Sequence, residues 1–408
     1  MVKTEIPLRM DRNLKILYVN RTMHGLPHIG GLQRMFHIGR QLKKCGAVTM
    51  LGVNYDFNPE ALELAAKEFE RVELMKLKKF RTPSPTLLEM RQKYQMHWPT
   101  NYGDRVDHED LKRFTRLSRE HDVVWFSLLS AANCFGNRRF ANSIVDLDDL
   151  MHVKFALRTQ IDKSLRWRMS AHLQSFKWRR QEFQSFQRFN IIVLCSTEDK
   201  QVMGNHRRIR IVPNGFPSPA NTPIWTPGQE GYLGFIGTLS YGPNVEGLEW
   251  FRDRVWPAIR KEMPQATLRL VGTLPKNHAF LNVPGFEPLG FVEDPTEEFS
   301  RWQAMIVPLR YGGGTRLKIL EAFSRKCPVI STPIGAHGLQ VTPNQDILLE
   351  ENPQAFAHQC LRLLKQPHQG KTIAEAGWEL FNRKYTWDVI GKSIQNIVAE
   401  IARKRSRS

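Results

Sequence analysis

The sequence predicts an α/β protein built from two doubly wound domains. The first observation is its length, because 408 residues exceed the roughly 250–300 residues at which a single core stops growing. The second is a repeated alternation of short apolar runs with helical stretches, which is typical of parallel sheets covered on both faces. The third is a stretch rich in Pro and Gly near the middle of the chain.

The first half of the chain contains five expected strands. The first, at 14–20, leads through a glycine-bearing loop into a helical pattern of apolar residues between 32 and 42. The other four are expected at 47–53, 123–127, 143–146 and 191–195. Residues 80–105 are rich in Pro, Lys, Tyr and Trp and indicate a long irregular insertion.

The second half repeats the alternation more regularly. Strands are expected at 232–236, 267–271, 304–308, 329–331 and 347–349, and helices at about 243–261, 315–326 and 352–365. The domain boundary is placed at Pro213-Asn214-Gly215, because four prolines follow between 216 and 231. We expect domains at 1–212 and 213–385, and a final helix with a basic tail at 386–408. Ligands bind beyond the carboxyl ends of parallel strands, so two such domains facing each other would form a binding cleft.

Composition excludes several classes of protein. With 41 % hydrophobic and 24 % charged residues the chain is ordinary globular material, and no apolar run approaches the ~20 residues of a membrane-spanning helix. The N-terminus has no apolar core of a secretory signal and the five cysteines have no metal-ligand spacing, so a cytoplasmic location is predicted. The net charge of +19 attracts anions, which leaves nucleic acid, phosphorylated metabolites and acidic lipid open.

The most informative segment runs from Pro308 through three consecutive glycines into a helix expected from 315. Glycines let the backbone approach a ligand closely, and the N–H groups at a helix N-terminus favour an anion. Arg316 and Lys318 fall in the first turn, where cations oppose the helix dipole, so a bound diphosphate would balance them. The Glu321 carboxylate suits the paired hydroxyls of a ribose. A glycine-rich loop with a solvated basic helix is the alternative, since Walker and dinucleotide motifs are both absent.

At this segment the sequence resembles the donor-binding signature of family 4 glycosyltransferases, which have the GT-B fold of two facing Rossmann-like domains. The resemblance is carried by several blocks in the expected order: STEDKQVM, IRIVPNGF, LGFIGTLSYGPNVEGLEWF, WPAIRKEMPQATLRLVG, LGFVED, GGGTRLKILEAF and CPVISTPIGAHGL. It covers residues 190–350 well, and the N-terminal half only through GGLQR.

The resemblance implies a retaining, hexosyltransferase-type enzyme of polysaccharide biosynthesis or a related pathway. It would move a sugar from a nucleotide-diphosphate sugar of UDP or GDP type to a glycan, lipid-linked or small-molecule acceptor, with no cofactor and no metal. The N-terminal domain would bind the acceptor, the C-terminal domain the donor, and the last helix would cross back. Arg316 and Lys318 would neutralise the leaving diphosphate and Glu321 would hold the ribose. The other implied donor contacts, with the base site at 291–292, are Gly30, Gly31, Gly237, Thr238, Gly272, Phe291, Val292, Gly312, Gly313, Gly314 and Thr315.

Two positions depart from the family pattern. Gly313 stands eight positions before Glu321, where many members have a glutamate that contacts the transferred sugar, so backbone N–H groups of the glycine run are expected to take its place. Pro243 and Asn244 stand where a basic residue is often found. This departure leaves charge neutralisation chiefly to the two cations that follow the glycine run.

The N-terminal half offers weaker candidates. Asp146, Asp148 and Asp149 end a predicted strand, where catalytic residues tend to lie. Asp146 is the candidate for a catalytic contact with acceptor or sugar, and an ordinary helix cap or an Asp-x-Asp metal site are the alternatives. His24 and His28 are candidate bases or phosphate contacts, or plain loop histidines.

Residues 154–190 are predicted to form one long helix, with nine Lys and Arg against two acidic residues for a charge of +7. One interpretation is a domain helix with a core-facing apolar stripe and a solvated basic face. The other is docking on an anionic membrane, with Trp167 and Trp178 at the interface, which would suit a lipid-linked acceptor and a peripheral location at the inner face of the membrane. The apolar stripe comprises Leu157, Ile161, Leu165, Met169, Leu173, Phe176, Phe183 and Phe186.

Two other functions stay open. A GT-B relative such as a nucleotide-sugar epimerase or a glycoside phosphorylase would share the fold, although no lysine context for pyridoxal phosphate is evident. A nucleic-acid-binding protein would suit the charge, but no helix-turn-helix, zinc or RRM pattern supports it, so no nucleic acid is expected as a partner.

Overall fold

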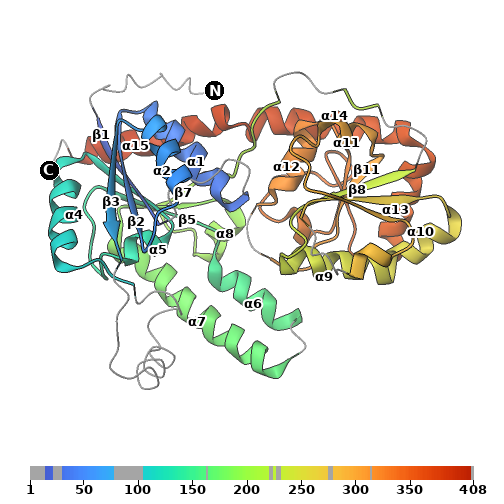
Figure 1. Ribbon diagram of the computed structural model, residues 1–408, viewed down its shortest axis with the longest axis horizontal. Helices are drawn as coiled ribbons and strands as arrows, with labels where there is room; N and C mark the ends of the chain where they lie inside the picture. Colours follow the sequence, from blue (N-terminus) through green and yellow to red (C-terminus); the bar gives the residue numbers. More distant parts are fainter. Residues whose placement is uncertain are drawn as a thin grey trace. The chain divides into compact units, whose positions relative to one another are not determined.

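The computed structural model describes residues 14–21, 30–77, 104–161, 164–219, 224–226, 231–273, 279–312 and 315–405. The chain divides into two compact units. Unit 1 comprises Met1–Val212 and Gly391–Ser408, and unit 2 comprises Pro213–Ile390. Each unit is an α/β layer structure (Figure 1), as the alternation of strands and helices predicts. The prediction that the two domains face each other across a cleft stays a prediction.

Unit 1 contains a parallel seven-stranded sheet of order β3-β2-β1-β4-β5-β6-β7. The five strands expected from apolar runs are confirmed, with ends within two residues of those predicted. Two edge strands, β3 and β7, were not expected, because one mixes charged with apolar residues and the other has three residues. The strands are β1 (Lys15–Asn20), β2 (Ala47–Asn54), β3 (Arg71–Lys76), β4 (Val123–Ser127), β5 (Ser143–Asp148), β6 (Ile191–Leu194) and β7 (Ile209–Ile211).

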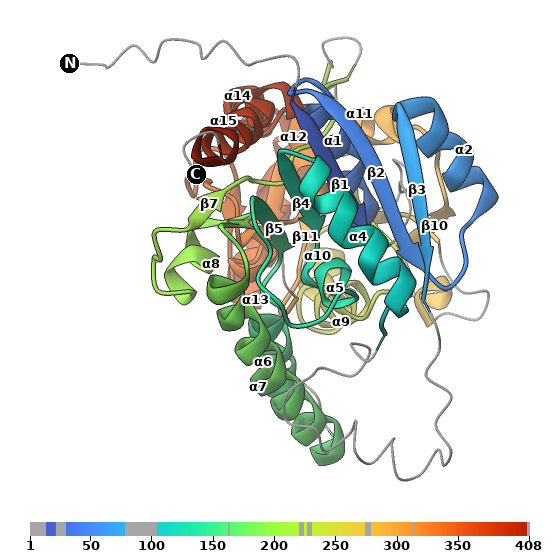
Figure 2. The same ribbon diagram turned by 90° about the vertical axis from the view of Figure 1, so that its left-hand side faces the viewer.

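Helices pack on both sides of this sheet (Figure 2). Two of them begin at side-chain caps: Asn58 accepts a hydrogen bond from the amide of Glu60, and Asp107 from that of Asp110. The insertion expected at 80–105 lies almost entirely outside the described residues. The helices are α1 (Gly30–Lys43), α2 (Pro59–Glu68), α4 (His108–Glu120), α5 (Leu129–Asn133), α6 (Met151–Ile161), α7 (Leu165–Arg188) and α8 (Thr197–Val202).

The prediction of one long helix at 154–190 is wrong. The segment forms two helices, α6 and α7, and the backbone at Ser164 is extended with φ −86° and ψ 125°. Apolar residues keep helical spacing on both sides of the break, so periodicity alone does not reveal it. The core-facing stripe is also wrong in part, because its members between Leu165 and Phe176 are exposed.

Unit 2 contains a parallel six-stranded sheet of order β10-β9-β8-β11-β12-β13. All five expected strands are present, and β10 is additional because Pro288 and Gly290 disguise it in the sequence. The strands are β8 (Tyr232–Ile236), β9 (Thr267–Val271), β10 (Phe286–Gly290), β11 (Ala304–Val307), β12 (Val329–Ser331) and β13 (Leu348–Leu349).

The helices of unit 2 depart from the expected ranges in two places. The helix expected at 243–261 contains a π-helical turn, Phe251–Val255, just before Pro257, which has no N–H to continue the regular α-helical ladder. The helix expected from 315 begins at Leu317, so Arg316 is its N-cap residue. The helices are α9 (Gly242–Trp250), α10 (Trp256–Glu262), α11 (Thr296–Arg301), α12 (Leu317–Ser324), α13 (Pro353–Lys365), α14 (Gly370–Lys384) and α15 (Trp387–Arg405).

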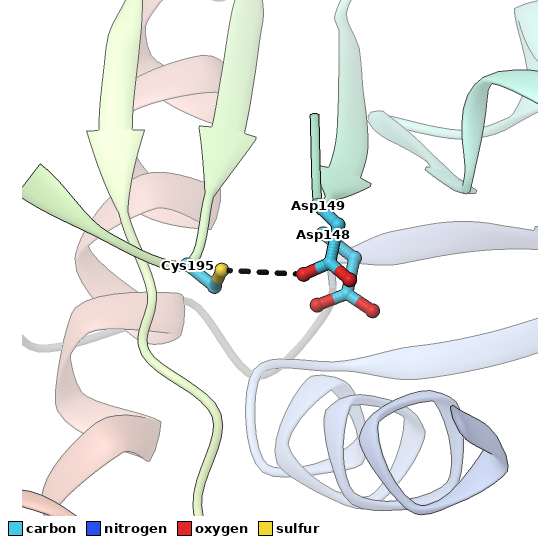
Figure 3. Close-up of side chains that lie close together, drawn as sticks. All are labelled: Asp148, Asp149 and Cys195. Atoms are coloured by element: carbon cyan, nitrogen blue, oxygen red, sulfur yellow. Dashed lines mark hydrogen bonds between the residues drawn. The ribbon is translucent and has the colours of Figure 1, made fainter. Parts of the chain in front are cut away.

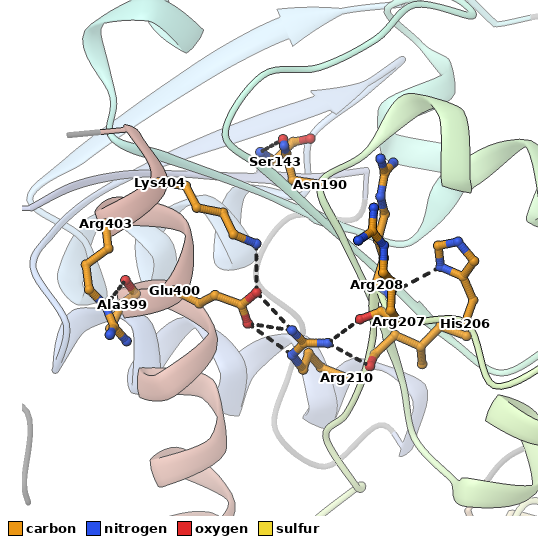
Figure 4. Close-up of polar contacts among 11 residues, drawn as sticks. Ser143, Asn190, His206, Arg207, Arg208, Arg210, Ala399, Glu400, Arg403 and Lys404 are labelled. Atoms are coloured by element: carbon orange, nitrogen blue, oxygen red, sulfur yellow. Dashed lines mark hydrogen bonds and ion pairs between the residues drawn. The ribbon is translucent and has the colours of Figure 1, made fainter. Parts of the chain in front are cut away.

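The last helix, α15, is divided between the units: its residues up to Ile390 count with unit 2 and those from Gly391 with unit 1. Within unit 1 the helix is fixed by charge pairs. Arg210 donates to both oxygens of Glu400 at 2.8–3.0 Å (Figure 4). Arg405 pairs with Asp122 at 2.9 Å. Among the described residues, none of the helices combines the length and the apolar character needed to cross a bilayer.

Candidate active site

Glycines end three neighbouring strands of unit 2 and bring loop backbones close together. Gly237 follows β8, Gly272 follows β9 and Gly312 lies after β11, all with φ between 125° and 147°, where side chains are strained. A Cβ on Gly272 would lie 2.1 Å from the carbonyl oxygen of Gly237, and one on Gly237 would lie 2.9 Å from the Nζ of Lys318. These loops therefore present backbone at the carboxyl edge of the sheet, where ligands bind in such folds.

Lys318, in the first turn of α12, reaches back to the end of β8. Its Nζ donates to Oδ1 of Asn244 at 3.0 Å and lies 3.9 Å from the ring centroid of Phe235. Asn244 is oriented in turn, because its Nδ2 donates to the carbonyl of Thr238 at 2.8 Å. Burial and the nearby Arg316 guanidinium lower the pKa of Lys318 to about 7. An anion bound here would raise that pKa again.

Arg316 and Thr315 connect the glycine run to α12. The Arg316 side chain is buried and folds over Gly312, where an added Cβ would lie 2.9 Å from one guanidinium nitrogen. Thr315 is also buried, and within the part of the chain that the structure describes its hydroxyl has no hydrogen-bond partner. Gly313 and Gly314 lie outside the described residues.

Glu321 lies one turn after Lys318 on α12 and pairs with Arg325 at 3.2 Å. Burial raises the pKa of Glu321, and the charges of Arg325 and Lys318 oppose that rise. Arg325 also donates to Oγ1 of Thr296 at 3.1 Å, so the start of α11 helps to orient the arginine that pairs with this glutamate.

Phe291 and Val292, the predicted base site, follow β10 at the end of the sheet. Phe291 is 65 % exposed, whereas Val292 packs against the core. The carbonyl of Gly290 accepts a hydrogen bond from the amide of Gly272 at 2.7 Å. Phe291 therefore follows directly on a strand end that is bonded to the glycine loops.

In unit 1, Asp146 lies at the end of β5 in a buried ion pair. Its two oxygens accept from Nε and a terminal nitrogen of Arg34, each at 2.9 Å, and Arg34 also donates to the carbonyl of Val212 at 2.9 Å. Burial raises the pKa of Asp146 and Arg34 opposes this, while Asp146 and Asp148 raise the pKa of Arg34 against the cost of its burial. The geometry suits a positioning carboxylate, and the predicted catalytic contact stays a prediction.

Gly30 and Gly31 are the first residues of α1, one turn before Arg34, so they belong to the helix and not to the loop in which they were expected. Their predicted contact with phosphates stays a prediction. His24 and His28 lie outside the described residues.

Asp148, Asp149 and Cys195 form one cluster of potential metal ligands, with one ligand atom of each within 4.8 Å of the others (Figure 3). The Cys195 thiol donates to Asp149 at 3.7 Å, and burial raises its pKa well above the ordinary value. Arg34, 3.5 Å from Asp148, already supplies a positive charge. The expectation that the protein uses no metal stays a prediction.

Three residues near these predicted sites were not assigned roles from the sequence. Asn244 was visible only as a departure from the family pattern, although the Pro-Asn pair at a helix start was a signal. Arg34 contacts Asp146 and Arg325 contacts Thr296, and both partners are distant in sequence. No spacing rule identifies such contacts.

Comparison with known proteins identifies a similar sequence family for part of the chain. Residues 230–366 match the family model described as "Glycosyl transferases group 1". A protein of Klebsiella pneumoniae, described as an uncharacterized 44.6 kDa protein in the cps region, is 24 % identical over 172 residues. That alignment spans 39 % of this chain and 44 % of the relative.

Solved structures resemble the chain over nearly its whole length. Sucrose-phosphate synthase from Thermosynechococcus elongatus superposes with a TM-score of 0.67 and 15 % identity, over 96 % of this chain and 100 % of the other. HepE from Anabaena, solved with UDP and glucose, gives a TM-score of 0.62 and 13 % identity over 95 % and 100 %. The chain therefore has the GT-B fold of these enzymes, and its second unit carries a segment that matches glycosyl transferases group 1.

Proposed function

We propose that the protein is a retaining, metal-independent glycosyltransferase that uses a nucleotide-diphosphate sugar. The observation that supports this best is the grouping of Arg316 and Lys318 with the backbone of three glycine loops at one sheet edge of unit 2. Two cations beside closely approaching loop backbone suit a diphosphate, and the matched family segment includes all these residues.

In the proposed reaction the C1–O bond of the donor sugar breaks and the electron pair leaves with the diphosphate. Arg316 and Lys318 stabilise the developing negative charge, which is the main demand of a dissociative transfer. The acceptor hydroxyl attacks from the face that the diphosphate leaves and gives its proton to a departing phosphate oxygen. No protein nucleophile is required in this reaction.

The donor sugar and the nucleoside take the remaining residues in this proposal. Backbone N–H groups of Gly312, Gly313 and Gly314 bind sugar hydroxyls in place of the glutamate that the family pattern has at 313. Glu321 accepts hydrogen bonds from the ribose, and its pairing with Arg325 sets its direction. The exposed ring of Phe291 is available to stack on the base.

For the nucleotide we propose UDP or GDP, and UDP first, because HepE has been solved with UDP and glucose. The acceptor is a glycan or a lipid-linked saccharide of polysaccharide biosynthesis, in keeping with the Klebsiella relative from a cps region. The proposed location is cytoplasmic, at the inner face of the membrane, with the N-terminal domain as the acceptor-binding part.

A thermal-shift screen tests the proposal. UDP or GDP should raise the melting temperature of the protein. At a nucleotide concentration one hundred times Kd, binding adds about 2.7 kcal/mol to the free energy of unfolding. Short oligonucleotides should not, and a shift with oligonucleotides alone would support a nucleic-acid-binding protein instead. A nucleotide sugar incubated without acceptor separates the enzyme classes, because an epimerase would convert it to an isomeric nucleotide sugar whereas a transferase would not.

A further inference from the structure

A row of apolar side chains on α7 is left uncovered in unit 1. This apolar row comprises Leu165, Met169, Leu173 and Phe176, which are 70, 65, 38 and 54 % exposed. Their spacing of four, four and three residues places them on one face of the helix. Helices on a domain surface normally turn such a face to the core. A continuous exposed apolar row instead marks an interaction surface.

The helices that carry the row are well anchored at their other end. Glu182 of α7 accepts hydrogen bonds from the amide of Met151 at 2.7 Å and from the imidazole of His152, both on α6. Ser175 donates to the carbonyl of His152 at 2.7 Å, and Arg188 donates to Asn133 at 2.6 Å. Both ribbon views show α6 and α7 side by side, reaching away from the sheet of unit 1 (Figures 1 and 2). The row is therefore held on a fixed support.

The charges beside the row have one sign. From 164 to 181 the sequence has no Asp or Glu, and four exposed arginines lie beside the row or at its end. On a helical projection Arg166 falls on one flank of the row and Arg168 and Arg179 on the other, whereas Arg180 continues the row one turn after Phe176. Lys177 is buried and so adds little to this surface.

We infer that this face of α7 docks on an anionic lipid bilayer, with the apolar row among the acyl chains and the arginines at the headgroup phosphates. Uncovered apolar area supplies one part of such binding and electrostatic attraction the other. A second copy of this chain fits less well, because stacking two rows would bring two sets of four arginines together without acidic partners. The inference rests on the proposed location at the inner face of the membrane, and it names the surface that would bind the lipid.

Vesicle flotation of the full chain tests it. Wild type should float with vesicles containing about one third phosphatidylglycerol in phosphatidylcholine, should float poorly with phosphatidylcholine alone, and should lose binding at high salt. The variant Leu165→Gln/Met169→Gln/Phe176→Gln should bind at least about tenfold more weakly. Its matched control is Val202→Gln/Leu281→Gln, which changes exposed apolar residues elsewhere and should bind like wild type.

A charge variant separates specific docking from general attraction. Replacement of Arg166, Arg168, Arg179 and Arg180 by glutamine should abolish binding to anionic vesicles. Replacement of four other exposed arginines, Arg116, Arg119, Arg138 and Arg139, removes the same charge and should weaken binding far less. Equal loss in both sets would overturn the inference, as would unchanged binding of the apolar-row variant.

Two further measurements keep the outcomes distinct. Sedimentation tests whether a second copy of the chain covers the apolar row. That would be the result if wild type self-associates and the apolar-row variant does not, while neither protein binds vesicles. The melting-temperature shift with UDP is measured on every variant and should be unchanged, because none of the substituted residues belongs to the proposed donor site. If wild type does not bind vesicles but is stabilised by UDP, only the docking surface is refuted. If wild type binds vesicles but is not stabilised by UDP, only the proposed donor is refuted.

Discussion

The two units place cations at strand ends in contrasting ways. In unit 1, Arg34 is matched by the Asp146 carboxylate within a buried pair, and both side chains are at most 4 % exposed. In unit 2, Lys318 makes its hydrogen bond to the neutral amide of Asn244, and burial with Arg316 lowers its pKa to about 7. The comparison teaches that the first charge has its counter-ion within the protein, whereas the second has a neutral partner, which is what the proposed binding of a diphosphate requires.

Loss of the unit 1 pair should have the largest effect. Arg34→Met leaves the Asp146 carboxylate buried without its cation, which should destabilise unit 1 by about 3–5 kcal/mol. Hydrogen exchange of the β1 and β5 backbone amides would measure this. The control Arg71→Met removes an exposed pair with Glu73 and should cost at most about 1 kcal/mol. Equal protection in the two variants would contradict the role given to Arg34.

Loss of the unit 2 cations should leave the fold intact and reduce turnover. Arg316→Ala and Lys318→Ala should each lower kcat at least about a hundredfold, or about 2.7 kcal/mol of transition-state stabilisation. Sugar transfer from the donor that the thermal-shift screen identifies is the measurement, with Arg252→Ala, a half-buried residue on the π-helical turn, as control. A folded Arg316→Ala enzyme at near wild-type rate would refute the proposed donor site.

The contrast also predicts a pH dependence for unit 2. Below about pH 7 Lys318 is already protonated in the free protein. Above it, binding of the diphosphate must bring a proton to Lys318, so donor affinity should fall by up to about tenfold per pH unit. Titration calorimetry from about pH 7 to about pH 9 would show this, with proton uptake that depends on the buffer. Lys318→Arg keeps its charge over this range and should bind with a flatter profile; the same slope in both proteins would exclude Lys318 as the titrating group.

The smallest effect is expected at the neutral partner. Asn244→Ala removes one hydrogen bond to Lys318, which is worth about 1 kcal/mol, and should lower kcat/KM about fivefold. Steady-state kinetics with Asn382→Ala, an exposed amide on α14, as control would measure it. A carboxylate is the sharper probe: Asn244→Asp should move the pH profile of donor binding upward, because it favours the charged Lys318.

The sequence predicts the strands far better than the contacts between side chains. Continuous apolar runs such as 123–127 and 232–236 match β4 and β8 residue for residue, because strands buried on both faces leave that pattern. Short or mixed edge strands do not leave it, so β7 and β10 were missed. The break at Ser164 was missed because the apolar spacing continues across it.

The candidate site divides in the same way. The sequence directly predicts the glycine run and the basic residues at the start of the following helix. The family resemblance adds Gly237 and Gly272 to the predicted site. The hydrogen bond between Lys318 and Asn244 joins residues 74 positions apart, and the Arg34–Asp146 pair joins residues 112 apart. Such partners are selected by the packing of whole elements, which no local pattern encodes.

The approach of Gly272 to Gly237 has a consequence for natural variation. A single methyl group at position 272 would collide with the neighbouring carbonyl, so alanine, the mildest of all replacements, is enough to displace the loop that ends β8. Among sequences otherwise like this one, a chain with alanine at 272 is expected to retain both sheets and every ionic side chain and yet to have lost its ability to take up a donor.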